Sequence, residues 1–178
     1  FLACSNSFVF DYCVRQKTSG THVTLFVLKQ IPMPTPPTLD QACPWSPEER
    51  RVAWLSDRAL ELVYTAHDLD AMAEEDATLP GPFVWDADRR ELIRAELDAA
   101  MLHLYGLDRS DAEHVLDSFG VARKYDETEH GEFRTKRLVL ERYDALAEAT
   151  ASGTPYQTIL DPPPGDVRMT HAAAKATA

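Results

Sequence analysis

The chain has 178 residues, a mass of 20.0 kDa and 44% hydrophobic residues, which is enough apolar content to bury the core of one or two small domains and excludes a disordered chain. Its formal net charge of −11 argues against a protein that coats nucleic acid through bulk positive charge. No apolar stretch approaches the ~20 residues of a membrane-spanning helix, so we expect no membrane partner.

Three cysteines, Cys4, Cys13 and Cys43, form neither an even set nor a Cys-x-x-Cys pair. This pattern argues against a disulfide framework and a zinc finger, so it favours a reducing, cytoplasmic location and predicts no bound metal. The first residue is Phe1, and no charged signal-peptide region precedes the first apolar segment. We therefore expect the sequence to start inside a longer protein.

Positive charge is concentrated near the N-terminus. Residues 1–38 contain Arg15, Lys17 and Lys29 against Asp11, a balance of +2, whereas residues 39–178 have a balance of −13. Any contact with nucleic acid is therefore expected in the N-terminal segment.

The first elements along the chain are expected to be a helix, a loop and a strand. Apolar residues recur at helical spacing over residues 2–16, and a polar, glycine-containing run follows at residues 17–21. Residues 22–29 are rich in Val, Leu, Phe and Thr and have the length of a buried strand. Six prolines between Pro32 and Pro47 then predict that regular structure stops, leaving a linker or an extended strap.

The rest of the chain is expected to be helical. Ser46, Pro47 and Glu49 have the pattern of a helix start, and apolar residues continue at helical spacing to Ala66. A second helix is expected between a cap at Asp86 and a stop at Gly106. Ser110 and Glu113 form a capping-box pattern for a short third helix, and residues 133–149 predict a fourth.

These elements predict a mainly α protein, with a helical bundle-like C-terminal region, a short N-terminal helix-loop-strand segment and a Pro-rich strap. The expected organisation is residues 1–38 as the first unit, 39–47 as a linker, 48–152 as a helical domain, and 153–178 as an extended tail with a frayed end.

The usual catalytic patterns are absent from the sequence, so no catalytic residues are expected. There is no GxSxG, GxxxxGK[ST], HExxH or GxGxxG motif. Asp98 and His103 lie on one predicted helix, but their spacing places them on different faces, and surface or capping roles are favoured. Asp161, followed by three prolines, has a superficial likeness to the base-holding motif of amino-methyltransferases, but Pro164 stands where an aromatic ring must stack.

Two basic clusters are candidates for DNA contact. For the cluster Arg134, Lys136 and Arg137, a solvated helix face paired with neighbouring glutamates is favoured over DNA contact. The loop RQKTSGTH is the better candidate, because it combines cations and hydroxyls with a glycine that lets backbone approach a phosphate. An ordinary polar turn remains an equal alternative. The candidate DNA-binding residues are Arg15, Lys17, Thr18, Ser19, Gly20, Thr21 and Lys29.

The run NSFVFDYCVRQKTSGTHVTLFVLKQIPMPTPP resembles the end of the target-recognition region in adenine-specific DNA methyltransferases of restriction-modification systems, particularly fused type IIG-like enzymes. The order that carries the resemblance is Asn6-Ser7, Asp11, Arg15, Gly20, and Lys29-Gln30-Ile31-Pro32. Asp98 followed by Leu104-Tyr105-Gly106-Leu107 resembles the helical C-terminal region of the same family, and EFRTKRLVLERYDALAEA and PYQTILDPPP are similar to its tail.

The resemblance implies a parent enzyme that transfers a methyl group from S-adenosylmethionine to adenine N6 in duplex DNA, either alone or fused to an endonuclease. It implies that the cofactor and the catalytic motif belong to an upstream methyltransferase domain, so that no cofactor is held here. This chain is then expected to contribute to target recognition and interdomain support. The alternative is a helical protein–protein interaction module of a multidomain cytoplasmic protein.

Overall fold

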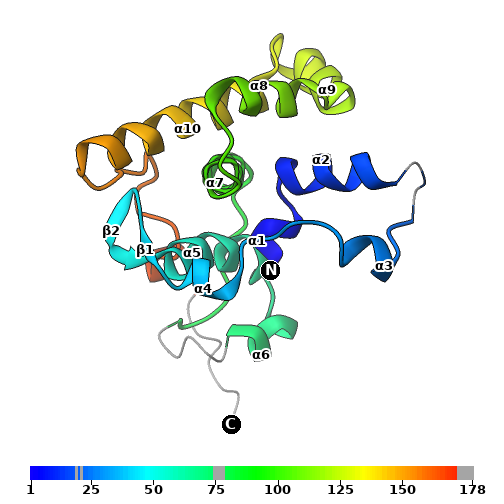
Figure 1. The fold of residues 1–178 in the computed structure, drawn as a ribbon. Helices are drawn as coiled ribbons and strands as arrows, with labels where there is room; N and C mark the ends of the chain where they lie inside the picture. The colour runs from blue at the N-terminus through cyan, green and yellow to red at the C-terminus, as the bar shows by residue number, and fades with distance from the viewer. Residues whose placement is uncertain (19, 21, 74–78, 172–178) are drawn as a thin grey trace.

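A computed structural model describes residues 1–18, 20, 22–73 and 79–171. This part of the chain is mainly helical, as predicted, and its one sheet within those ranges is a two-stranded antiparallel pair (Figure 1). None of the described helices is both long and apolar enough to cross a membrane.

Helix α7 (Ala87–Leu104) is the centre of the fold. Figure 1 shows it end-on, with α10 (Arg134–Ser152) crossing on one side and α5 (Arg51–Val63) on the other. Residues 95–102 are all buried, because neighbours cover the helix on every face. The predicted cap is confirmed, since the Asp86 side chain accepts a hydrogen bond from the Arg89 backbone N–H, and Gly106 follows the helix with a φ of 71°.

The helices that follow α7 differ from the predictions in two details. Helix α8 (Arg109–Asp117) is capped by Asp108, whose carboxylate accepts the backbone N–H groups of Ser110 and Asp111, so the predicted Ser110 cap is wrong. Helix α9 (Gly120–His130) was not predicted and contains no buried residue, so it lacks the apolar stripe that sequence periodicity detects. Helix α10 is confirmed and ends at Gly153.

The single N-terminal helix predicted over residues 2–16 is two helices, α1 (Leu2–Ser5) and α2 (Phe8–Lys17). The chain turns at Asn6 and Ser7, where the Ser7 hydroxyl donates to the Cys4 carbonyl at 2.7 Å and accepts from the Phe10 N–H. Serine therefore acts here as an N-cap rather than as a helix-interior residue.

The strand predicted over residues 22–29 is wrong. Residues 22–24 have no regular structure, and α3 (Leu25–Leu28) is a four-residue helix whose first turn is capped by Thr24, which accepts from the Val27 N–H. A strand needs a partner, and no strand of the described chain pairs with this segment. Residues whose composition favours a strand therefore form a short helix here, because the Thr24 cap stabilises its first turn.

Regular structure also does not stop in the proline-rich segment. Thr35 caps α4 (Pro36–Leu39), where proline occupies the first turn, and strands β1 (Ala42–Cys43) and β2 (Ser46–Arg50) form the hairpin. The predicted helix start at Ser46 is wrong, because the Ser46 hydroxyl donates to Glu49 at 2.7 Å inside β2 and α5 begins at Arg51. Cys43 and Trp45 are buried in the main core, so this proline-rich segment contributes residues to that core.

Beyond α5 lie a short 3-10 helix (His67–Leu69) and α6 (Asp70–Ala73), beside a small second core around Tyr64 and Phe83. Residues 154–171 are largely irregular, as expected, with one 3-10 turn (Val167–Met169). They are packed rather than loose, since the Tyr156 N–H donates to the Trp45 carbonyl at 2.7 Å and Leu160 is buried. The predicted frayed end, residues 172–178, lies outside the described residues.

Candidate nucleic-acid interface

The candidate basic residues lie on an arm made of α2, the following loop and α3, which extends away from α7 and α5 (Figure 1). Arg15 and Lys17 lie in the last turn of α2, and Lys29 directly follows α3. Thr18 ends α2, and its hydroxyl accepts the Gly20 N–H at 3.3 Å. The fold thus places the cations of the candidate set at two helix ends. Ser19 and Thr21 lie outside the described residues.

Arg15 already has partners in α2 and at the start of α9. Its guanidinium donates to both carboxylate oxygens of Asp11, at 2.7 and 3.1 Å, and lies 4.5 Å from the centre of the Phe119 ring. The hydrogen bonds that Arg15 donates to the Asp11 carboxylate raise the pKa of Arg15. Both side chains of the ion pair remain about half exposed, so the pair contributes little free energy and leaves Arg15 accessible to an anionic partner.

Lys17 and Lys29 are the cations that the arm leaves most available. Both are exposed, and neither forms an ion pair with any residue in the described part of the chain. Residues 12–39 contain no Asp or Glu, although the whole chain carries 29 of them. No carboxylate within residues 12–39 therefore neutralises Lys17 or Lys29, whereas most other cations of the chain have carboxylates close by in the sequence.

Apolar side chains share the arm with these cations. Phe26 and Leu25 on α3 are 76% and 65% exposed, and Val23 is also exposed. Sequence reasoning missed this feature, because a buried strand was expected here. The absence of Asp and Glu from residues 12–39 was the sequence signal that marks this segment as different from the rest of the chain.

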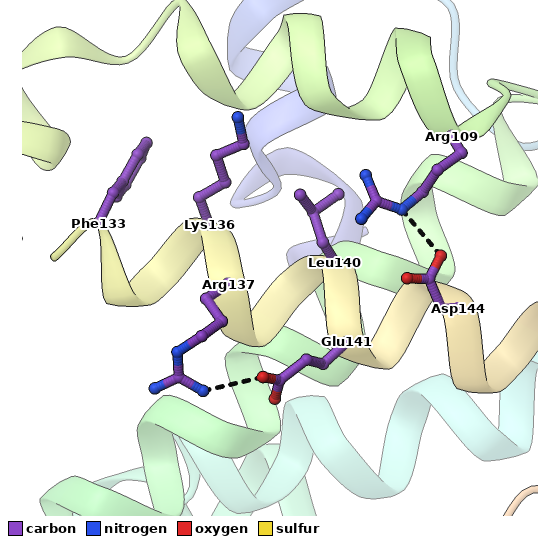
Figure 2. A pocket seen from close by; sticks show the side chains of 7 residues that line it. All are labelled: Arg109, Phe133, Lys136, Arg137, Leu140, Glu141 and Asp144. Carbon is purple, nitrogen blue, oxygen red and sulfur yellow. Dashed lines mark hydrogen bonds and ion pairs between the residues drawn. The ribbon is translucent and has the colours of Figure 1, made fainter.

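The second basic cluster is neutralised internally. A hollow of about 300 Å³ is lined by residues of α8 and α10. Within it, Arg137 pairs with Glu141 at 2.9 Å and Arg109 with Asp144 at 2.8 Å (Figure 2). Lys136 points toward α8, where its ammonium pairs with Asp117 at 2.8 Å. The hydrogen bonds that Arg137 donates to Glu132 and Glu141 raise the pKa of Arg137. This hollow therefore offers little free positive charge to a phosphate.

A larger pocket of about 480 Å³ lies where α2 starts, between α7, α9 and α10. Carboxylates predominate among the charged groups that line it: Asp88, Glu91, Asp98, Asp126 and Glu129, against Arg94, Arg134 and His130. Arg134 is paired with Glu91 at 2.9 Å. A polyanion is disfavoured at this pocket, so the arm remains the best candidate surface for nucleic acid.

Asp98 and His103 have structural partners. The Asp98 carboxylate accepts the Phe8 N–H at 2.8 Å, which is a capping role, but the residue is buried rather than on the surface. Burial raises the pKa of Asp98 to about 7. The His103 ring stacks on Tyr143 with centroids 3.9 Å apart, and Nε2 is 2.9 Å from the Tyr143 carbonyl. Burial lowers the pKa of His103, so a neutral ring donates this hydrogen bond.

The segment beginning at Asp161 is a structural strap. The Arg89 guanidinium donates to the carbonyls of Pro162 and Pro163, at 2.7 and 3.2 Å, and forms a buried ion pair with Glu61. The Glu61 carboxylate also accepts the Gly165 N–H at 2.8 Å. The carbonyls that follow Asp161 are thus bound within the protein, in keeping with the rejection of a base-holding motif.

A second buried ion pair joins Arg58 of α5 to Glu96 of α7 at 2.7 Å. Glu96 also accepts the hydroxyls of Tyr156 and Thr158, at 2.9 and 2.5 Å. Sequence reasoning missed both buried pairs, although charged residues that interrupt apolar helix faces are a detectable sign of them. These pairs bind the C-terminal strap to the helical body.

The cysteines show no sign of a metal centre. All three are free, Cys4 and Cys43 are buried, and the described residues contain no group of three or more His, Cys, Asp or Glu side chains arranged to hold a metal ion. Burial raises the pKa of Cys43 to about 11. These thiols therefore serve as small apolar side chains.

Comparison with protein-family models, with curated proteins and with solved structures found no match to this chain.

Proposed function

We propose that this chain is a non-catalytic C-terminal portion of an adenine-specific DNA methyltransferase of a restriction-modification system, in which the arm contacts DNA and the helical body supports neighbouring domains. The observation that carries the proposal is the arm itself, which presents Lys17 and Lys29 in a segment without carboxylates on an otherwise acidic protein. The sequence resemblance supplies the class of enzyme.

In this proposal the arm positions DNA through phosphates and does not perform chemistry. Lys17, Lys29 and the partly neutralised Arg15 hold the backbone, and Thr18 and Gly20, which follow Lys17 closely in the sequence, contact it as well. S-adenosylmethionine and the base-holding motif belong to the upstream methyltransferase domain of this cytoplasmic parent enzyme. The acidic body faces away from the duplex and packs against other domains.

The test is the salt dependence of DNA binding. Binding of this chain to a fluorescent duplex is measured by anisotropy at several salt concentrations, starting low because the acidic body weakens binding. Lys17→Gln and Lys29→Gln should each reduce the slope of log K against log salt by about 1, and Arg15→Gln by less. The matched control is Lys124→Gln, an exposed lysine on α9 that also forms no ion pair within the described chain.

Equal slopes for the wild type, Lys17→Gln and Lys29→Gln would contradict the proposal. An equal loss in Lys124→Gln would show that the net charge, rather than the arm, determines binding.

A helical protein–protein interaction module is the second candidate, and one observation favours it. Val121 and Tyr125 lie one turn apart on α9, and each is 72% exposed. A pull-down with Val121→Asp and Tyr125→Ala variants tests this face, and loss of a protein partner without any change in DNA binding would favour this reading.

A further inference from the structure

The end of the arm has an apolar point, which we call the α3 tip and define as Val23, Leu25 and Phe26. Phe26 is the most exposed large hydrophobic residue of the described chain, at 76%. A single exposed apolar side chain is ordinary, but three within four residues at the end of a projection form a feature that a partner can contact.

The α3 tip is held firmly by the rest of the fold. Val27 and Leu28, on the same short helix, are half-buried and pack against the main core, so α3 has one face inward and one outward. Downstream, Ile31 is buried, and the Tyr105 hydroxyl donates to the Pro32 carbonyl at 2.6 Å. The exposure of Leu25 and Phe26 is therefore set by packing rather than by a loose chain.

Charge and area together restrict the partner. The tip lies in the carboxylate-free residues 12–39, with Lys17 at the end of α2 and Lys29 directly after α3, which fits an anionic partner. A stable protein interface buries roughly 800 Å² on each side, whereas an aromatic side chain supplies about 150–250 Å². The amphipathic helices that bind lipid surfaces bury a continuous apolar face, whereas α3 has four residues and exposes Leu25 and Phe26.

A nucleic-acid duplex fits both constraints, because it offers apolar base faces between two rows of phosphates. We propose that the α3 tip is an apolar wedge that contacts partly unstacked bases through Phe26 and Leu25, while Lys17 and Lys29 hold the flanking phosphates. Proteins of other folds insert Phe or Leu side chains between base steps in this way. This inference rests on the proposed DNA-binding function and adds that the arm distorts the duplex.

The test uses this chain and short duplexes that are either fully paired or carry one central mismatch, with 2-aminopurine beside the mismatch position. Unstacking costs less at a mismatch, so a wedge should bind the mismatched duplex more tightly and increase 2-aminopurine fluorescence. Phe26→Ala should remove this preference and weaken binding at least about fivefold, because base–aromatic stacking is lost. Phe26→Trp should retain both properties.

Two sets of variants separate the wedge from the phosphate contacts. Phe26→Ala should leave the salt slope unchanged, whereas Lys17→Gln and Lys29→Gln should reduce the slope and retain the mismatch preference. Tyr125→Ala is the matched control, since this ring is 72% exposed but lies on α9 outside the carboxylate-free segment. It should bind as the wild type does. Thermal melting by circular dichroism checks that each variant is folded.

The failure of the wedge can be told apart from the failure of the proposed function. If the lysine variants lose salt slope while Phe26→Ala binds and unstacks as the wild type does, the wedge is overturned and the DNA-binding function stands. If neither set changes DNA binding, both are overturned. If Phe26→Ala instead loses adsorption to phosphatidylserine vesicles and keeps its DNA binding, the tip contacts lipid and the wedge is also overturned.

Discussion

The backbone N–H of Phe8, the first residue of α2, donates a 2.8 Å hydrogen bond to the carboxylate of Asp98, which is buried in the middle of α7. This contact joins the arm to the central helix across 90 residues of sequence. The contact is one of several that position the arm, because Val9, Phe10 and Val14 of α2 are also buried in the main core.

Asp98 should make the protein less stable as the pH rises. Burial raises its pKa from 3.8 to about 7, so between these values the unfolded chain releases a proton that the folded chain retains. Below about pH 4 its contribution to the free energy of unfolding is most favourable. Between about pH 4 and pH 7 this contribution falls by roughly 1.4 kcal/mol for each pH unit, and above about pH 7 it is constant.

Asp98→Asn keeps an oxygen acceptor for the Phe8 N–H and removes the buried charge, so it should be more stable than the wild type above pH 7. Urea unfolding between pH 4 and 8 measures both proteins. Parallel stability curves for the two would contradict this assignment. Asp98→Ala, which removes the acceptor as well, should be less stable than Asp98→Asn.

Glu96→Gln should destabilise the protein by about 3–5 kcal/mol, because it leaves the Arg58 charge buried without its partner. The free energy of unfolding in urea measures the effect. The control is Glu127→Gln, whose partner Arg123 is about half exposed, and its cost should stay within about 0.5 kcal/mol. Similar costs for the two variants would mean that the buried pair is not a special source of stability.

Two glycines provide a matched test of backbone conformation. Gly106 and Gly120 both have open space where a Cβ would lie, but only Gly106 has a positive φ, of 71°. Gly106→Ala should cost about 1–2 kcal/mol, because an L-residue is strained in that region. Gly120→Ala, at the start of α9, should be neutral or stabilising by up to about 1 kcal/mol. Thermal or urea unfolding gives both values, and equal effects would count against the conformational explanation.

Thiol labelling should follow burial. Cys13 is half-buried, whereas Cys4 and Cys43 are buried, and burial raises the pKa of all three thiols. A thiol reagent should therefore label Cys13 first under native conditions, and the other two only on unfolding. Cys13→Ser should remove the native labelling. Rapid native labelling of that variant would show that the core opens more readily than the packing implies.

Local signals were sufficient for the elements that have their own caps and periodic apolar residues. Asp86 and Gly106 delimit α7 as predicted, and Gly153 ends α10, because these side chains and glycines act on the backbone next to them. The cationic N-terminal segment was equally visible, since charge is a property of composition alone. The order of α5, α7, α8 and α10 along the chain followed from such signals.

Only the tertiary structure decided how the remaining residues are used. Residues 22–29 have the composition of a strand, yet no partner strand lies beside them, so Thr24 caps a short helix and Phe26 is exposed. Asp98 was expected in a surface or capping role and is buried. The partners of Asp98, Glu61 and Glu96 all come from distant parts of the chain. Caps act on the backbone within one turn of the helix, whereas strand pairing and burial depend on which distant residues the fold brings together. Local sequence patterns do not reveal those contacts.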